Sequence, residues 1–243
     1  MSSVTLDLTP PIARLTFVDH AVGADEVRDI VSAVQSLADD ESVRVIIVAT
    51  AGGWDKAAIG SREAAIVSGI LSDPFGALAT VSKPVICVVD GEVSGGSLAL
   101  ALAADIRVAG QGAAITFDDV AAGRVPVAGT TQRLARLVGR GNALDVVLSG
   151  RAVDAAEAMR IGLVSEVATD PHQRVGEIAS RIAERGPVAV AYAKEVIVRG
   201  VEMPLEQALR YETDLTVILQ TTEDRAEGVE AFLSKRKPEF KGR

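Results

Sequence analysis

One stretch, Lys83 to Asp105, constrains the fold more than any other, because it changes from strand-like to helix-like sequence across a glycine turn. Its first part, Val85 to Val89, is a short run of Val, Ile and Cys that is typical of a fully buried strand. After Asp90-Gly91 and Gly95-Gly96-Ser97 comes Leu98 to Ala104, a run of the strong helix formers Leu and Ala. The stretch therefore predicts a buried strand, a glycine turn and the start of a helix.

The glycine turn is a candidate site for a negatively charged group. The first N–H groups of a helix have no partner within the helix, and the positive end of the helix dipole favours an anion in front of them. A dinucleotide or Walker motif does not fit, because no Lys follows Gly96 and because Gly91 and Gly95 stand four residues apart. An oxyanion or a phosphate is expected, with phosphate the weaker prediction, and an ordinary strand-to-helix turn is the alternative.

Five segments match, in order and spacing, the motifs of one known superfamily. Beside the glycine turn they include a strand and loop ending in Ala-Gly-Gly-Trp, a run Pro-Val-Ala-Gly-Thr-Thr-Gln-Arg-Leu, a series from Leu-Ser-Gly-Arg to Gly-Leu-Val-Ser, and a C-terminal Glu-Gly-Val-Glu-Ala-Phe signature. The chain therefore resembles the crotonase (enoyl-CoA hydratase/isomerase) superfamily over nearly its whole length. The five segments are residues 43–54, 83–105, 126–134, 143–167 and 227–238.

The resemblance implies an α/β fold in two parts. Residues 1–170 would form a crotonase-like spiral of repeated ββα units, and residues 171–243 would form helices that cover the active site and join subunits into a homotrimer or a dimer of trimers. The pattern agrees, since strands alternate with helices up to about residue 167 and the sequence after Pro171 is helical throughout. The apolar residues of this helical tail are also more than a small core absorbs, which independently favours assembly.

Local patterns predict the individual elements. Apolar runs and turn signals predict the strands, and apolar residues at helical spacing predict the helices. The strands are expected at Val4–Leu8, Ile12–Val18, Val43–Thr50, Ile106–Ala109 and Ala113–Phe117, and the helices at Asp25–Leu37, Arg62–Val81 with a break near Asp73-Pro74, Thr130–Val138, 171–185, 187–200, 203–221 and 224–236.

The resemblance further implies that the protein binds an acyl-CoA thioester and stabilises the enolate formed at its carbonyl oxygen. Two backbone N–H groups, those of Ala58 and Gly96, would point at that oxygen, and such donors each lower the barrier by ~3–4 kcal/mol. The neighbouring Lys56, Ala57 and Gly95 are expected to contact the substrate. The first loop departs from the family pattern Ala-Gly-Ala-Asp, and Ala57 in place of Gly changes the path of the loop if that position needs a positive φ.

The carboxylates that move protons decide which reaction is expected. Family hydratases use two Glu residues; here Ala99 stands in place of the first, and Asp119, one methylene shorter, stands in place of the second. One carboxylate can carry a proton between two carbons of a 3-enoyl-CoA, so isomerisation is favoured over hydration, with Asp119 as the sole acid/base. A helix cap or a solvated turn is the alternative for Asp119, and the expectation for Asp118. Whether Glu92 or Ser94 replaces the missing Glu stays open.

The grip on CoA is expected to be weaker than in the family. In the C-terminal signature Phe232 and Lys235 would help to bind CoA in a neighbouring subunit, although the basic residues there also suit a helix C-terminus. Near the N-terminus a basic family segment is replaced by Val18 to Ala24, a loop that contains His20. A catalytically silent acyl-CoA-binding protein, or another CoA-thioester reaction such as decarboxylation or hydrolysis, therefore remains an alternative. The acyl chain is not predicted.

Composition limits the class of protein. A net charge of −8 and a pI near 4.9 argue against nucleic acid as a partner. Cys87 is the only cysteine and lies in an apolar strand, which excludes a disulfide framework and indicates a reducing compartment. The absence of a signal peptide and of a long apolar run predicts a cytoplasmic protein with no membrane partner. No Cys/His cluster suggests a metal, and no cofactor is expected beyond the CoA of the substrate.

Overall fold

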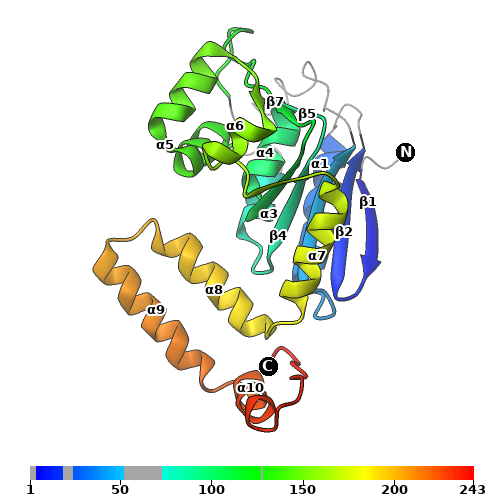
Figure 1. Cartoon of the computed structure of the whole chain (residues 1–243), viewed down its shortest axis with the longest axis vertical. Helices are drawn as coiled ribbons and strands as arrows, with labels where there is room; N and C mark the ends of the chain where they lie inside the picture. Colours follow the sequence, from blue (N-terminus) through cyan, green and yellow to red (C-terminus); the bar gives the residue numbers. More distant parts are fainter. Residues whose placement is uncertain (1–3, 19–23, 52–72, 127) are drawn as a thin grey trace.

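The computed structural model describes residues 4–18, 24–51, 73–126 and 128–243. In these residues the chain forms a six-stranded sheet of order β1-β2-β3-β4-β6-β9 and a small sheet of order β5-β7-β8 (Figure 1). The strands are β1 (Val4–Thr9), β2 (Ile12–Val18), β3 (Val45–Ala51), β4 (Val85–Val89), β5 (Glu92–Val93), β6 (Ile106–Gly110), β7 (Ala114–Ile115), β8 (Val153–Asp154) and β9 (Glu166–Ala168).

Several of the described helices begin at capping residues that their sequences supply. The side chains of Asp73, Asp154 and Asp170 each accept a hydrogen bond from a backbone N–H in the first turn of the helix that follows. The helices are α1 (Ala24–Asp39), α3 (Pro74–Thr80), α4 (Gly95–Ala103), α5 (Thr130–Ser149), α6 (Ala155–Arg160), α7 (Pro171–Ala183), α8 (Pro187–Gly200), α9 (Leu205–Leu219) and α10 (Glu223–Leu233).

The large sheet is parallel except at one edge. β1 and β2 form an antiparallel hairpin, and β2, β3, β4, β6 and β9 then run parallel to one another. Parallel strands need covering on both faces, and β4 is accordingly buried at all five positions. The mixed α/β fold predicted from the alternation of strands and helices is confirmed.

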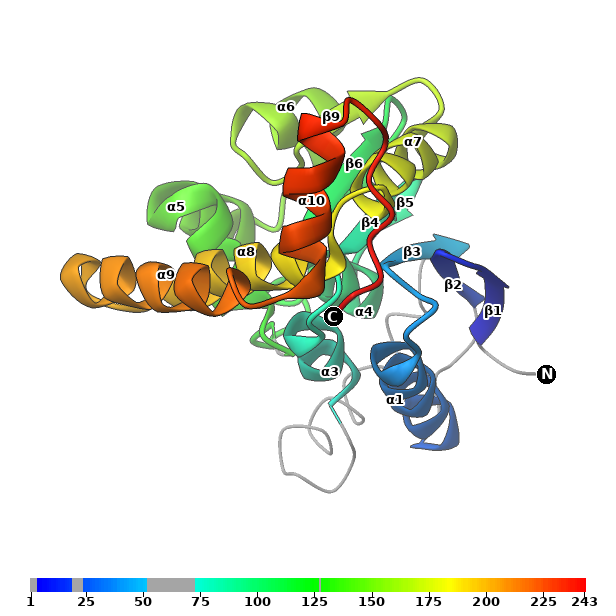
Figure 2. The same cartoon turned by 90° about the horizontal axis from the view of Figure 1, so that it is seen from below.

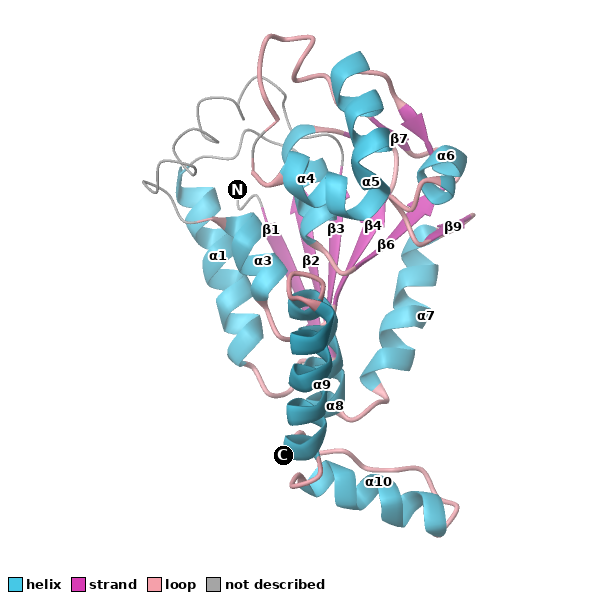
Figure 3. Cartoon of the chain, turned by 90° about the vertical axis from the view of Figure 1, so that its left-hand side faces the viewer, coloured by secondary structure: helices cyan, strands magenta, loops and turns pink. Residues whose placement is uncertain are grey.

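Two apolar layers cover the faces of this sheet. On one face Ile46, Val48 and Cys87 pack in a large core that includes residues of α1, α3 and α4. On the other face Ile47 and Val88 pack in a second core that includes residues of α7. Figure 3 shows α7 on the side of the sheet opposite α1, α3 and α4. The alternation of side chains along each strand thus supplies both cores.

The last three helices extend away from the sheets in Figure 1, and α8 and α9 project to one side in the view of Figure 2. No residue of α8 or α9 is buried in the single chain, although the two helices pack closely against each other. The division expected at residue 170 stays a prediction, since α7, which follows it, lies against the sheet. Among the described residues, no helix is both long enough and apolar enough to cross a lipid bilayer.

The structure differs from the predicted elements mainly in one helix. α5 continues to Ser149 instead of ending at Val138, and it does so across Gly139, whose φ of 78° and ψ of 157° are not helical. The sequence predicted the end of the first part correctly, because the glycine breaks the helix there. The second part was not predicted. Of the helix expected at Arg62–Val81, the described residues contain only α3, which begins directly after the expected break at Asp73.

Candidate functional site

The glycine turn predicted between β4 and α4 is present. Gly91 has a φ of 65° and Gly95 a φ of 51°, both in the left-handed region that favours glycine. Between them lies the short strand β5. The chain therefore passes from β4 into α4 within a few residues, through two left-handed glycines.

The start of α4 is fixed by a serine. The Ser97 hydroxyl accepts a hydrogen bond from the backbone N–H of Ser94 at 3.1 Å and donates one to the carbonyl of Ser94 at 2.7 Å. The first intrahelical bond runs from the N–H of Leu98 to the same carbonyl, at 3.4 Å. The N–H of Gly96 precedes that bond, so it has no partner in the helix and can donate to a ligand. Gly96 itself is buried.

The small sheet carries Asp119 toward the same turn. β5 and β7 are parallel, with Val93 paired to Ile115, and the N–H of Thr116 donates to the carbonyl of Val93 at 3.0 Å. Gly96 follows Val93 by three residues, and Asp119 follows Thr116 by three residues. Parallel strands end at the same edge of a sheet, so the Gly96 amide and the Asp119 carboxylate leave the small sheet at the same end.

Asp119 lies in one helical turn that ends at a left-handed glycine. Gly123 has a φ of 72°, its N–H donates to the carbonyl of Val120 at 3.0 Å, and the N–H of Arg124 donates to the carbonyl of Asp119 at 2.8 Å. These two hydrogen bonds define a Schellman motif. The motif folds the chain so that Arg124, the residue after Gly123, lies next to Asp119, four residues before Gly123.

The Arg124 guanidinium contacts the Asp119 carboxylate. Its Nε and Nη2 atoms both lie 3.2 Å from Oδ1 of Asp119, and the Asp119 side chain is 19% exposed. Arg124 is not among the site residues predicted from the sequence. The sequence signal for this contact is Gly123 followed by Arg124. A Schellman motif at such a glycine brings the side chain that follows it against the side chain four residues before it. Asp119 is thus neither a helix cap nor a fully solvated residue, and Asp118, at the start of the turn, is half-buried.

The candidates for the missing acid/base group differ in burial. Ala99 is fully buried in the core, and its methyl side chain cannot move a proton. Ser94 is buried beside the glycine turn, whereas Glu92 is exposed on β5. Ser94 is therefore better placed than Glu92 to replace the missing Glu.

The opposite end of α4 is held by a buried arginine. Arg107 is 4% exposed and donates hydrogen bonds to the carbonyls of Ala101, Ala104 and Leu163 at 3.2, 2.5 and 2.8 Å. Burial lowers the pKa of this guanidinium, because removal from water disfavours the charged form. The guanidinium charge lies where the helix dipole is negative, so it stabilises α4 and the turn at its other end.

The C-terminal signature lies far from the glycine turn of its own chain. Phe232 is 83% exposed and Lys235, with a φ of 52°, follows the end of α10. Figures 1 and 3 show α10 at the end of the molecule opposite α4 and the small sheet. The structure therefore does not bring Phe232 and Lys235 together with Gly96 and Asp119 within one chain. Three further predicted residues, Lys56, Ala57 and Ala58, and also His20, lie outside the described residues.

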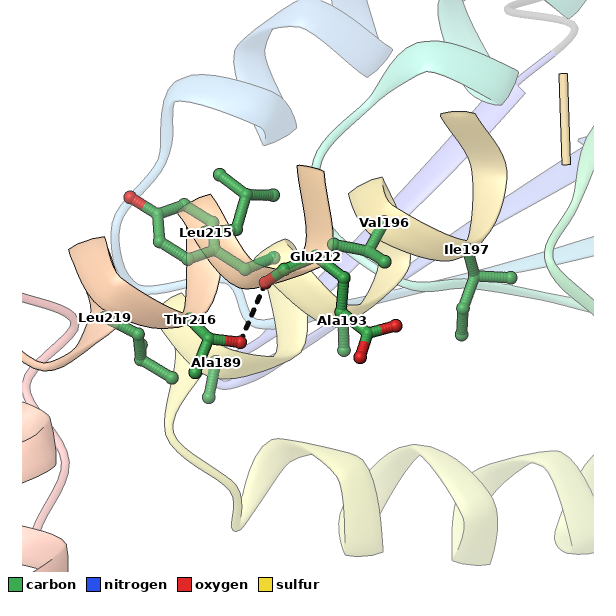
Figure 4. A pocket seen from close by; sticks show the side chains of 9 residues that line it. Ala189, Ala193, Val196, Ile197, Glu212, Leu215, Thr216 and Leu219 are labelled. Carbon is green, nitrogen blue, oxygen red and sulfur yellow. Dashed lines mark hydrogen bonds between the residues drawn. The ribbon is translucent and has the colours of Figure 1, made fainter. Parts of the chain in front are cut away.

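A groove of about 320 Å³ lies between α8 and α9 (Figure 4). It contains Val196 and Ile197 of α8 and Leu215 of α9, and its walls are largely apolar. No residue of the glycine turn lines it, so it is not the place of the predicted chemistry. Among the described residues, no three His, Cys, Asp or Glu side chains are grouped as metal ligands.

Comparisons with known proteins agree with the geometry. A model of the family described as enoyl-CoA hydratase/isomerase matches residues 12–243. The 2,3-dehydroadipyl-CoA hydratase of Escherichia coli K12 is 34% identical, over 98% of this chain and 94% of that protein, and the crotonyl-CoA hydratase of Syntrophomonas wolfei is 34% identical, over 91% and 89%. The crystal structure of an enoyl-CoA hydratase from Bacillus anthracis has a TM-score of 0.91 and 28% identity, and covers 100% of both chains.

Proposed function

Because the chain belongs to the enoyl-CoA hydratase/isomerase family, we propose that it binds an enoyl-CoA thioester and moves the double bond of a 3-enoyl-CoA to the 2-position. The observation that carries this proposal is the contrast between Asp119, at the end of the small sheet, and Ala99 of α4. Asp119 provides a partly buried carboxylate there. Ala99, in place of the other Glu of family hydratases, has only a methyl group and cannot move a proton.

The proposed reaction needs one carboxylate and one anion site. Asp119 removes a proton from C2 of the acyl chain, and the electron pair of that C–H bond forms an enolate whose charge rests on the thioester oxygen. The Gly96 amide, with the Ala58 amide as second donor, stabilises this oxyanion. Asp119 then returns the proton to C4 while the double bond moves from C3–C4 to C2–C3. No oxidant, water or cofactor is consumed.

Hydration is the disfavoured reaction. It requires one group to take a proton from water and another to give a proton to carbon, and each such group contributes ~10²–10⁴-fold to the rate. One relative is named as a crotonyl-CoA hydratase, so crotonyl-CoA is the reference substrate for a hydration assay. We expect slow hydration of crotonyl-CoA and measurable isomerisation of 3-hexenoyl-CoA. Efficient hydration would show that another residue, with Ser94 the first candidate, takes the place of the missing Glu.

Asp119→Asn tests the proposal, because it keeps the size of the side chain and removes the base. We expect isomerisation to fall by ~10²-fold or more, while the affinity for acyl-CoA changes little. Unchanged isomerisation in this variant would contradict the role of Asp119. Asp118→Asn, at the neighbouring position, is the matched control and should keep its activity.

The binding of CoA is proposed to use a second subunit. Phe232 and Lys235 are exposed and lie away from the glycine turn of their own chain, so they fit the CoA of a neighbour in a homotrimer or a dimer of trimers. The helices of residues 171–243 that hold them would then be the assembly region, with residues 1–170 as the core. A cytoplasmic location fits a substrate of this kind.

A catalytically silent acyl-CoA-binding protein is the second candidate. It is favoured by one observation, the contact that already engages an oxygen of Asp119 with the Arg124 guanidinium. Calorimetry with a saturated acyl-CoA distinguishes the two. Binding without turnover of either enoyl-CoA would favour the silent protein, whereas turnover that depends on Asp119 would exclude it.

A further inference from the structure

The contact between residues 119 and 124 depends on the shape of the backbone. In a Schellman motif the side chain just after the left-handed residue meets the side chain that begins the last turn, and an apolar pair usually occupies these two places. Here the pair is Asp119 and Arg124. Because Gly123 sets the left-handed conformation, the backbone itself brings the guanidinium to the carboxylate.

Among the residues that the structure describes, the Arg124 guanidinium engages one oxygen of the Asp119 carboxylate and leaves the other. Both Nε and Nη2 of Arg124 approach Oδ1 at 3.2 Å, so the two donors share a single acceptor. This arrangement differs from the usual two-by-two pairing of Arg with a carboxylate, in which both oxygens are engaged. Oδ1 is the anchored oxygen, and Oδ2 is the oxygen that remains for a proton.

We propose that Arg124 is the positioning residue of Asp119, and that it holds Oδ1 so that Oδ2 carries the proton between C2 and C4 of the acyl chain. This inference rests on the proposed function, in which Asp119 is the acid/base. Asp reaches one methylene less far than Glu, so a short carboxylate that must meet two carbons in turn gains from a fixed orientation. Arg124 does not touch the reacting carbons and acts through Asp119.

The first test replaces Arg124 and follows isomerisation of 3-hexenoyl-CoA. A positioning error of about 1 Å can cost ~10²-fold in rate, so Arg124→Met should lower kcat by about 10- to 100-fold and change KM by less than about threefold. Arg124→Lys should recover part of the loss, because it restores a cation without the planar fork. Free guanidinium at a concentration below unfolding should also recover part of the rate of Arg124→Met. Arg160→Met, which removes an exposed arginine paired with Glu157, is the control and should keep its kcat.

The second test changes the turn and leaves the arginine in place. Gly123 has space for a Cβ but has a positive φ, which a β-branched residue disfavours and Asn tolerates. Gly123→Val should therefore lose kcat as Arg124→Met does, while Gly123→Asn should keep most of it. This pair keeps the proposal testable if Arg124→Met does not fold.

The outcomes separate this inference from the proposed function. If Asp119→Asn abolishes isomerisation while Arg124→Met and Arg160→Met are equally active, the inference is wrong and the proposed function stands. A rise in KM of Arg124→Met with kcat unchanged would make Arg124 a substrate-binding residue and would also overturn the inference. A loss of kcat that neither Arg124→Lys nor guanidinium recovers would indicate a structural role and overturn it. If Asp119→Asn keeps full activity, the proposed function fails and the inference fails with it.

Discussion

Lys194 of α8 forms an ion pair with Asp105, the residue directly before β6, with 2.7 Å between Nζ and Oδ2. The same Oδ2 atom accepts a hydrogen bond from the backbone N–H of Val85 at 2.7 Å, and Nζ also donates to the carbonyl of Lys83 at 2.9 Å. Lys194 is only 10% exposed in a helix that has no buried residue. This contact therefore attaches the C-terminal helices to the strand that leads into the glycine turn.

Lys194→Met should lower the free energy of unfolding by about 2 kcal/mol, because it removes hydrogen bonds to a charged group and leaves the Asp105 carboxylate without its cation. Urea unfolding followed by circular dichroism measures the change. Lys237→Met, in an exposed part of the C-terminal tail, is the control and should change the free energy by less than about 0.5 kcal/mol. Equal effects in the two variants would contradict the role of the Lys194 contact.

Gly95→Ala should reduce activity more than stability. A φ of 51° disfavours Ala by roughly 1–2 kcal/mol, and relief of that strain would move the Gly96 amide that follows it. We expect kcat for the thioester reaction to fall by about 10- to 100-fold, since an oxyanion donor acts only when correctly placed. Gly112→Ala is the control, because Gly112 has room for a Cβ and no positive φ. Equal kcat values for the two variants would contradict a role for the turn.

The elements that the sequence predicted well are those whose signals are local. The apolar run of β4, the glycines before α4 and the break at Gly139 each act within a few residues, so they could be located from the sequence alone. The Asp119–Arg124 contact could not be located in this way, because it depends on a left-handed φ at Gly123 and on the turn before it. A glycine has many other uses, and its conformation is decided by the surrounding structure.

The helical tail shows a different limit of sequence-based prediction. Its excess of apolar residues predicts a surface for assembly, which stays a prediction, and α8 and α9 have no buried residue in the single chain. Which side chains stay exposed depends on how α8 packs against α9, a contact between helices that the sequence does not encode locally. The first oxyanion donor expected at Ala58 lies outside the described residues.

Acid should weaken the attachment of the C-terminal tail to α10. The carboxylate of Glu227 accepts hydrogen bonds from the Arg236 guanidinium at 2.5 and 2.7 Å and from the N–H of Glu239 at 2.7 Å. These contacts, with the guanidinium first, lower the pKa of Glu227 to about 2 from an ordinary value of 4.5. A lowered carboxyl pKa contributes stability that is complete above pH 4.5 and is lost as the pH falls through about 2.

Glu227→Gln measures this contribution. The melting temperature of the wild type should exceed that of the variant at pH 6, and the difference should shrink as the pH falls from about 4.5 toward 2. Glu239→Gln changes an exposed carboxylate of the same tail and serves as the control. A difference between wild type and Glu227→Gln that grows in acid would contradict the assigned direction of the pKa shift.

Ile197→Glu should separate the subunits of the proposed trimer. Ile197 is 67% exposed in the single chain, lines the groove between α8 and α9, and lies near the tip of that helical pair, where Val201 and Leu205 are each 76% exposed. Burial of such a side chain stabilises an interface by ~1.5–3 kcal/mol per copy, and burial of an unpaired carboxylate costs more than that gain. We therefore expect light scattering at micromolar concentration to give the mass of a trimer or hexamer for the wild type and of a monomer for the variant. Gln35→Glu adds the same charge at an exposed position of α1 and should leave the mass unchanged. A monomeric wild type would contradict the proposed assembly, whereas a trimeric Ile197→Glu would show that the subunits meet through a different surface.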